Sequence, residues 1–266
     1  MSSSGWHIGV IGGSAEDAGI AFDSAQEIVV KSPFGEPSGP VTTGMLGGVR
    51  FTFLARHGEG HRLPPASVNY RANIDVLKRC GVTDVLALSS VVSLREDLAG
   101  GQMVAIDQFI DQTGGRSGSF FGTGLVGHVD LADPVCPRLS ALVVASGTQV
   151  QAGGCYVAID GPQLPTRAER QVFQSWGGAV VGMTAMPEAR LAREAELPYA
   201  LLALVTPDAN AQAARDLISQ LASLLPPRRE PSPIDRALDN AIVTAPSARD
   251  LRLVAMLDAV AGRVLG

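Results

Sequence analysis

The feature that most constrains the fold of this chain is a series of short, almost continuous apolar runs separated by longer amphipathic stretches. The runs HIGVI (7–11), DVLALS (84–89) and YALLALV (199–205) lack the alternation of a half-exposed strand. They are typical of strands that are buried on both faces of a sheet. Further strands are predicted at 41–43, 49–55, 103–106, 154–159 and 179–182. Strands that alternate with helices in this way predict an α/β protein.

Stretches with helical spacing of apolar residues separate these strands. Residues 67–80 show this spacing, and Gly81 follows as a C-terminal stop. Other helices are predicted at 136–145, 166–176, 187–195, 209–225, 234–242 and 249–264. The last two follow a proline-rich connection, 226–233, and we expect them to pack on the same sheet. Residues 1–266 are thus expected to form a single domain, a central mixed twisted sheet flanked by helices, with residues 1–6 flexible.

The composition argues against several classes of function. A net charge of −5 with 18% charged residues is not the basic surface that binds nucleic acid. No apolar run is long enough to cross a membrane, and the N-terminal sequence lacks the features of a secretory signal. The three cysteines, Cys80, Cys136 and Cys155, are widely spaced. They indicate reduced thiols in a cytoplasmic protein without a CxxC-type metal site.

Polar side chains follow several predicted strands at the points where those strands end. They carry a hydroxyl, a guanidinium or an imidazole group: Ser14, Arg56, His57, Ser89, Ser90 and Thr184. Ligands gather at the carboxyl ends of strands in α/β sheets, and these groups, with the backbone N–H groups of Gly12-Gly13, are suited to an anion such as phosphate. Each element also has a structural alternative, since two glycines can make a tight turn and an Arg-His pair can lie in a solvated loop.

Two other kinds of site are disfavoured. The stretch GVIGGSAEDAG does not fit the G-x-G-x-x-G register of dinucleotide-binding proteins. The chain also lacks a G-x-S-x-G motif, which argues against a serine hydrolase of the α/β type.

Eight motifs occur in collinear order between residues 7 and 206. They are IGVIGGS, SPFGEPSGPV, LARHGEGHRLPPASVNYRANI, SLRED, IDQFIDQT, HVDLADPVCP, DGPQLPTRAE and GMTAMPEARLAREAELPYA. In this order they resemble the trimeric purine nucleoside phosphorylase family, in particular its methylthioadenosine and methylthioinosine phosphorylase branch. The stretch ALDNAIVTAPSARDLRL is similar to the C-terminal helices of bacterial and archaeal members. The resemblance implies the nucleoside phosphorylase fold and phosphorolysis, which converts a purine nucleoside and phosphate to free base and ribose 1-phosphate.

The resemblance also implies roles for individual residues. The phosphate would be bound by the hydroxyl groups of Ser14, Ser89 and Thr184 and by the pair Arg56-His57. In this pair the arginine fork and a charged histidine would donate hydrogen bonds. Met183 would pack under the ribose, and His61 would lie near its 5′ side. His128 would enter the 5′ pocket of a neighbouring subunit in a homotrimer, or in a hexamer built as a dimer of trimers. Inorganic phosphate is the co-substrate, and no metal or organic cofactor is implied.

The predicted base pocket departs from the family pattern. Ser90-Val91-Val92 stands where relatives have Ala-Cys-Gly or Ala-Val-Gly, so that Val92 adds a branched side chain beside the purine. Gly182 replaces an asparagine. The family motif T-D-x-D reads Thr206-Pro207-Asp208-Ala209 here. Pro207 therefore stands where the family has the aspartate that protonates purine N7. Asp208 could act as the catalytic acid only if the loop differs.

Three interpretations of function stay open. Leu164 and the missing first aspartate are shared with the methylthioinosine branch, which favours phosphorolysis of a 6-oxopurine nucleoside with a 5′-methylthio or other 5′ modification. The segment after Ala209 is shorter than the family's lid, which predicts a more open 5′ pocket. A second interpretation is a repurposed member that acts on a different nucleoside in specialised metabolism. A third is an inactive homologue that binds phosphate or a nucleoside.

Overall fold

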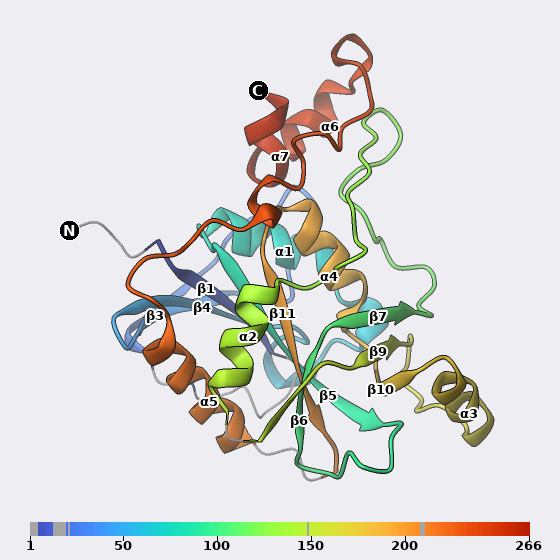
Figure 1. Cartoon of the computed structure of the whole chain (residues 1–266). Helices are drawn as coiled ribbons and strands as arrows, with labels where there is room; N and C mark the ends of the chain where they lie inside the picture. The colour runs from blue at the N-terminus through green and yellow to red at the C-terminus, as the bar shows by residue number, and fades with distance from the viewer. Residues whose placement is uncertain (1–4, 13–19, 21, 148, 208–210) are drawn as a thin grey trace.

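The three apolar runs form the centre of the sheet in the computed structural model of this chain. They are β1 (His7–Gly12), β5 (Asp84–Ser93) and β11 (Tyr199–Val205), and β5 pairs in parallel with both of the others. The structure describes residues 5–12, 20, 22–147, 149–207 and 211–266. Figure 1 shows these strands crossing the middle of the molecule.

The central strands are buried on both faces, as their sequences predict. In β5, Val85 and Ala87 belong to one hydrophobic cluster, whereas Leu86 and Leu88 belong to another on the opposite face. Every residue of β1 and β11 is buried. Successive side chains of a strand point to opposite faces, so only a strand covered by helices on both sides tolerates a continuous apolar run.

The rest of the sheet is mixed. On one side, β4 (Val49–Ala55) lies parallel to β1, and β3 (Val41–Leu46) and β2 (Asp23–Ile28) follow as antiparallel neighbours. On the other side of β11, β6 (Met103–Ile106) pairs antiparallel with β11 and parallel with β8 (Val150–Ala152). The prediction of a central mixed sheet is therefore confirmed.

The strand β5 is longer than predicted because its second half joins another branch of the sheet. Val92 and Ser93 pair antiparallel with β10 (Gly178–Gly182). Beyond β10, β9 (Cys155–Ala158) and β7 (Gln108–Asp111) continue in parallel order. On this side β5 pairs with β1 from Asp84 to Ala87 and with β10 at Val92 and Ser93, and no described strand pairs with the residues between them.

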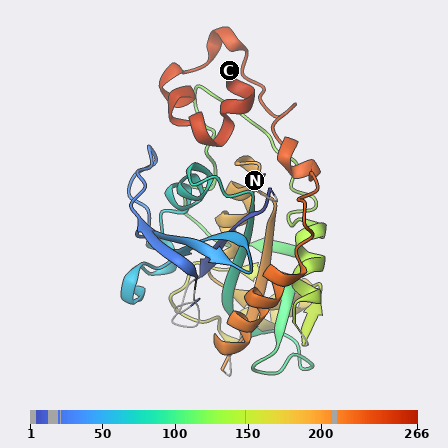
Figure 2. The same cartoon turned by 90° about the vertical axis from the view of Figure 1, so that its left-hand side faces the viewer.

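Helices cover both faces of the sheet. The bounds of the helices are α1 (Tyr70–Arg79), α2 (Pro137–Ala145), α3 (Arg167–Ser175), α4 (Ala185–Glu194), α5 (Ala211–Leu224), α6 (Leu251–Met256) and α7 (Asp258–Leu265). Helices α1, α4 and α7 share one face, α2 and α5 pack together on the other, and α3 lies beside β10. In Figures 1 and 2 the red C-terminal helices form one end of the molecule, next to α1. None of the helices in the described part of the chain has the length and apolar character needed to span a membrane.

The C-terminal segment differs from the two helices that were predicted there. Residues 234–242 form a short 3-10 helix (Pro233–Arg236) and turns, because the N–H of Leu238 donates to the carboxylate of Glu196 (3.0 Å) instead of to a carbonyl one turn back. The predicted helix 249–264 is divided at Leu257 into α6 and α7. Three more 3-10 turns are Glu59–His61, Pro65–Ser67 and Pro246–Ala248.

Candidate functional site

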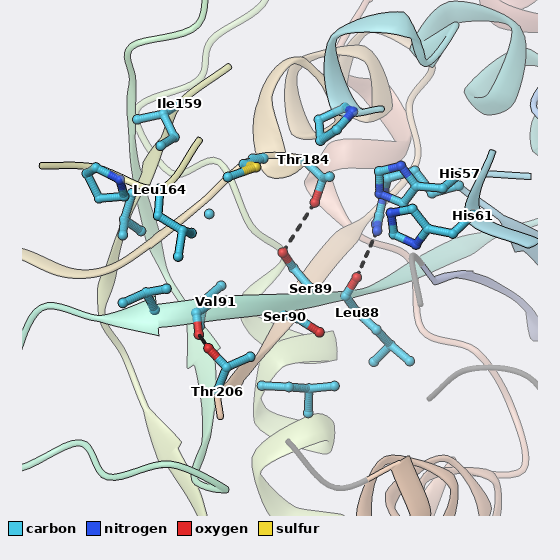
Figure 3. A pocket seen from close by; sticks show the side chains of 18 residues that line it. His57, His61, Leu88, Ser89, Ser90, Val91, Ile159, Leu164, Thr184 and Thr206 are labelled. Atoms are coloured by element: carbon cyan, nitrogen blue, oxygen red, sulfur yellow. Dashed lines mark hydrogen bonds between the residues drawn. The ribbon is translucent and has the colours of Figure 1, made fainter. Parts of the chain in front are cut away.

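A cavity of about 280 Å³ opens where β4, β9, β10 and β11 end, alongside the second half of β5 (Figure 3). Most of the residues predicted for the site line it: Arg56, His57, His61, Ser89, Ser90, Val91, Val92, Leu164, Gly182, Met183 and Thr184. They come from four separate parts of the sequence. The ends of β4 and β10, which the sequence singles out, thus meet beside Ser89 and Ser90, which lie within β5 and not at a strand end as predicted.

Four predicted site residues are not among those that line the cavity. Ser14 and Asp208 lie outside the described residues. Pro207 is exposed, and the preceding Thr206 lines the cavity. His128 is also exposed, and its backbone N–H donates to the carbonyl of Ala241 (2.9 Å) in the C-terminal segment. Within a single chain, therefore, His128 does not reach the cavity.

The guanidinium group of Arg56 is bound mainly by another residue of the chain, Glu188 in the first turn of α4. Its Nε donates to Glu188 Oε2 (2.7 Å) and its Nη2 to Oε1 (2.9 Å), and both side chains are only 1% exposed. Nη1 donates to the carbonyl of Leu88 (2.9 Å), and Nη2 also donates to that of Ile11 (3.2 Å). Of the five N–H groups of an arginine, one on Nη1 has no partner among these contacts.

This arrangement corrects the expectation that the whole arginine fork binds phosphate. The fork is occupied by Glu188, so among the contacts of the described residues one N–H of the Arg56 guanidinium is left for an anion in the cavity. Burial by itself would lower the pKa of Arg56, but the charge and hydrogen bonds of Glu188 outweigh it and raise the pKa. Glu188 also accepts a hydrogen bond from the hydroxyl of Tyr199 (2.9 Å). Glu188 was missed at the sequence level, although it lies within the motif that begins GMT.

The imidazole of His57 is held in one tautomer. Its Nδ1 lies 2.7 Å from the carbonyl oxygen of Leu63, and since a carbonyl only accepts hydrogen bonds, Nδ1 carries the proton. Burial, opposed by this hydrogen bond and reinforced by Arg56 and His61, lowers the pKa of His57 to about 4. At neutral pH its Nε2 is therefore an acceptor, in contrast to the predicted charged donor. The ring stacks on His61, with centroids 4.1 Å apart.

The neutral state of His57 predicts a pH dependence of stability. The pKa of His57 is about 4 in the folded protein, whereas an ordinary histidine, as in the unfolded chain, has a pKa of 6.5. Between these two pH values the unfolded chain therefore binds more protons than the folded protein. The contribution of His57 to stability is thus complete above pH 6.5 and falls by at most about 1.4 kcal/mol per pH unit as the pH drops to 4. We expect the difference in unfolding free energy between the wild type and His57→Asn to shrink over this range in urea titrations. A difference that is constant from pH 7 to pH 4 would contradict the neutral assignment.

Two hydroxyl groups lie together at the same end of the cavity as Arg56. Ser89 Oγ is 3.2 Å from Thr184 Oγ1, as the dashed line in Figure 3 shows, and the Arg56 guanidinium binds the carbonyl of the residue before Ser89. Both side chains are buried at the cavity wall. Two hydroxyl donors and a guanidinium N–H are appropriate for the oxygens of an anion.

The other end of the cavity is apolar. Its lining includes Val92, Ile159, Leu164 and Val181, of which Leu164 is 65% exposed. Thr206 contributes a hydroxyl that donates to the carbonyl of Val91 (3.0 Å), also marked in Figure 3. No acidic side chain lines the cavity within the part of the chain that the structure describes. This end can take a flat aromatic ring but, in these residues, offers it no carboxylate.

Arg116 is a second buried arginine that the sequence analysis missed. Its Nη1 donates to the carbonyls of Met183 and Met186 (both 2.7 Å), and its Nη2 donates to those of Ile159 (3.3 Å) and Asp160 (3.1 Å). Its Nε lies 3.2 Å from Asp160 Oδ1, an ion pair without hydrogen-bond geometry. Arg116 therefore joins the loop after β10 to the end of β9, two walls of the cavity. Its signal in the sequence, one arginine in a glycine-rich loop, is too weak to find it.

The described residues contain no group of three His, Cys, Asp or Glu side chains that could hold a metal ion. That the protein needs no organic cofactor stays a prediction.

The family model described as the phosphorylase superfamily matches residues 7–224. The S-methyl-5′-thioadenosine phosphorylase of Bradyrhizobium diazoefficiens is 48% identical over 284 residues, which cover 97% of this chain and 98% of the relative. The protein of the same name in Cereibacter sphaeroides is also 48% identical, with the same coverage.

Solved structures show the same similarity. The crystal structure of a methylthioadenosine phosphorylase sourced from an antarctic soil metagenomic library matches with a TM-score of 0.89 and 38% identity, covering 95% of this chain and 98% of that chain. A mutant of adenosine/methylthioadenosine phosphorylase from Schistosoma mansoni, in complex with adenine, matches with a TM-score of 0.84 and 31% identity over 93% and 99% of the two chains.

Proposed function

The chain belongs to the phosphorylase superfamily and is a pentosyltransferase of the S-methyl-5′-thioadenosine phosphorylase branch, and from this premise we propose that its substrates are phosphate and a 5′-methylthio purine nucleoside. Phosphorolysis forms a bond between a phosphate oxygen and C1′ of the sugar while the C1′–N9 bond breaks. The base leaves with the electron pair of that bond and takes up a proton. The products are the free base and 5-methylthioribose 1-phosphate.

One observation supports this proposal above the others: the cavity is divided into an anion-binding end and an apolar end. The Ser89 and Thr184 hydroxyls and the free N–H of Arg56 lie at the first end, where they can hold phosphate below the anomeric carbon. Holding the nucleophile in line with the bond that breaks accounts for much of the rate acceleration in such a reaction. We assign Ser14, outside the described residues, to the same phosphate site.

His57 takes a different role in this proposal from the one that its sequence predicts. Because Nε2 is an acceptor at neutral pH, it can receive a hydrogen bond from a protonated phosphate oxygen or from a ribose hydroxyl. Met183 and His61 also line the cavity, and we assign them to the ribose. The apolar residues Val91, Val92 and Leu164 then face the base.

The identity of the base separates two candidates. The names of the relatives favour the 6-aminopurine of methylthioadenosine. The 6-oxopurine predicted from Pro207 and Leu164 is favoured by the lack of an acidic side chain along the cavity in the described residues. We take the aminopurine as the leading candidate, because relatives with that name align over almost the whole chain.

The exposed position of His128 supports a homotrimer. Its side chain lies away from the cavity of its own chain, which leaves it available to the 5′ pocket of a neighbouring subunit. A hexamer made of two trimers would keep the same contact.

Release of free base tests the proposed function. We expect S-methyl-5′-thioadenosine to yield adenine and 5-methylthioribose 1-phosphate in equal amounts, only when phosphate is present, with the inosine analogue assayed in parallel by chromatography. Thr184→Val keeps the side-chain shape but removes the hydroxyl, and should raise the phosphate KM by about tenfold or more, as expected for a lost hydrogen bond to a charged group. Base release without phosphate, or no release from either nucleoside, would refute phosphorolysis of these substrates.

A further inference from the structure

Tyr156 has a buried hydroxyl that faces the phosphate end of the cavity from behind. The residue lies on β9 and is fully buried, with 0% of its surface exposed, and it is not among the residues that line the cavity. Its ring packs edge-on against Phe109. A phenolic hydroxyl at such depth needs hydrogen-bond partners, and the partners here are Ser89 and Thr184, both of which do line the cavity.

The chemistry of these partners sets the direction of the hydrogen bonds. The backbone N–H of Thr184 only donates, so the Tyr156 oxygen accepts from it (3.2 Å). The phenol has one proton of its own, and Ser89 Oγ at 3.1 Å is the acceptor within reach. Once Ser89 Oγ accepts this hydrogen bond, its own O–H is free to point to Thr184 Oγ1 (3.2 Å) or into the cavity.

Gly182 makes room for the phenol. A Cβ atom at this position would lie 2.1 Å from the Tyr156 hydroxyl oxygen and 2.5 Å from its Cζ, closer than non-bonded atoms approach. The family pattern has an asparagine where this chain has Gly182. In this chain the Tyr156 hydroxyl fills the space into which a side chain at position 182 would project. The position of the phenol therefore requires glycine at 182.

From these contacts we propose that Tyr156 is a positioning residue for the phosphate co-substrate. It fixes the backbone of Thr184 and orients the Ser89 hydroxyl so that this hydroxyl donates to the anion. The proposal rests on the proposed function, since it assumes that Ser89 and Thr184 bind phosphate. Orienting donors before the ligand arrives reduces the conformational cost of binding.

The variant Tyr156→Phe tests the proposal because it removes the hydroxyl and keeps the ring. We expect the Kd of phosphate, measured by calorimetric titration without nucleoside, and the KM of phosphate each to rise about tenfold, the usual scale for one hydrogen bond to a charged network. The KM of the nucleoside should stay within about twofold. Tyr156→Met, which lacks the hydroxyl and differs in shape, should have the same effect.

A double-mutant cycle separates positioning from general packing. If Tyr156 acts through Ser89, then Tyr156→Phe should have little further effect on phosphate binding in a Ser89→Ala background. Thr52→Val is the control, since it removes another buried hydroxyl, which is hydrogen-bonded to His7 and Thr43 and is not among the residues that line the cavity, and its phosphate Kd should be unchanged.

The outcomes separate the role of Tyr156 from the proposed function. A wild-type protein that releases base and binds phosphate, combined with an unchanged phosphate Kd in Tyr156→Phe, would overturn the role of Tyr156 alone. Additive effects of Tyr156→Phe and Ser89→Ala, or equal increases in both KM values, would do the same. A wild-type protein that neither binds phosphate nor shows phosphorolysis would overturn the proposed function and this inference together.

Discussion

Glu188→Gln is expected to lower the free energy of unfolding by about 3–5 kcal/mol, the range found when one partner of a buried ion pair is removed. The guanidinium of Arg56 would lose the carboxylate that compensates its charge at 1% exposure, while its other bonds go to neutral carbonyls. Urea denaturation followed by circular dichroism measures the loss.

The matched control for this variant is Glu36→Gln, which makes the same change at an exposed position. Substitutions of this kind at the surface usually change stability by less than about 0.5 kcal/mol. A loss of under 1 kcal/mol in Glu188→Gln would show that the carboxylate of Glu188 does not compensate Arg56 in solution.

The triple variant Arg56→Met, Glu188→Leu, Tyr199→Phe is expected to be more stable than Glu188→Gln and yet to lose phosphate binding. Apolar replacement of a buried ion pair is often neutral or stabilising, and Tyr199→Phe removes the hydroxyl that would otherwise lose its acceptor. We expect the phosphate Kd to rise about a hundredfold, because Arg56 is the one Arg or Lys side chain among the described residues that line the cavity.

Calorimetric titration of phosphate into the folded triple variant measures this effect. Comparison with Glu188→Gln separates stability from function, since we expect the triple variant, which has no charge at these positions, to fold. A phosphate Kd within threefold of the wild type would exclude Arg56 from the phosphate site.

The central strands could be predicted from the sequence because their signal is local. β1, β5 and β11 contain short apolar runs, and their shortness favours a buried strand over a buried helix, which needs more residues. β2 could not be predicted in this way, because its sequence DSAQEI is exposed at every position and becomes a strand only by pairing with β3. The prediction of a helix at 234–242 was wrong for a related reason, since the N–H of Leu238 donates to the carboxylate of the distant Glu196.

The candidate site was predictable in part. Arg56 and Thr184 could be singled out because each follows a strand, and the ends of neighbouring strands meet. Ser89 was singled out at a predicted strand end, although it lies within β5 in the structure. Glu188 and Tyr156 could not be singled out, because their partners are 132 and 67 residues away along the chain. The protonation state and the tautomer of His57 could not be predicted from the sequence either, since burial and the carbonyl of Leu63 determine them.

The sequence by itself therefore determined the α/β architecture, the strand ends that carry polar groups and the resemblance that indicates phosphorolysis. Only the tertiary structure decided which way those polar groups face: Arg56 towards Glu188, Ser89 towards Tyr156, and His57 towards Leu63. The physical reason is that hydrophobic periodicity depends on neighbours along the chain, whereas a buried charge or hydroxyl must be matched by whichever partner the packing of distant segments brings to it.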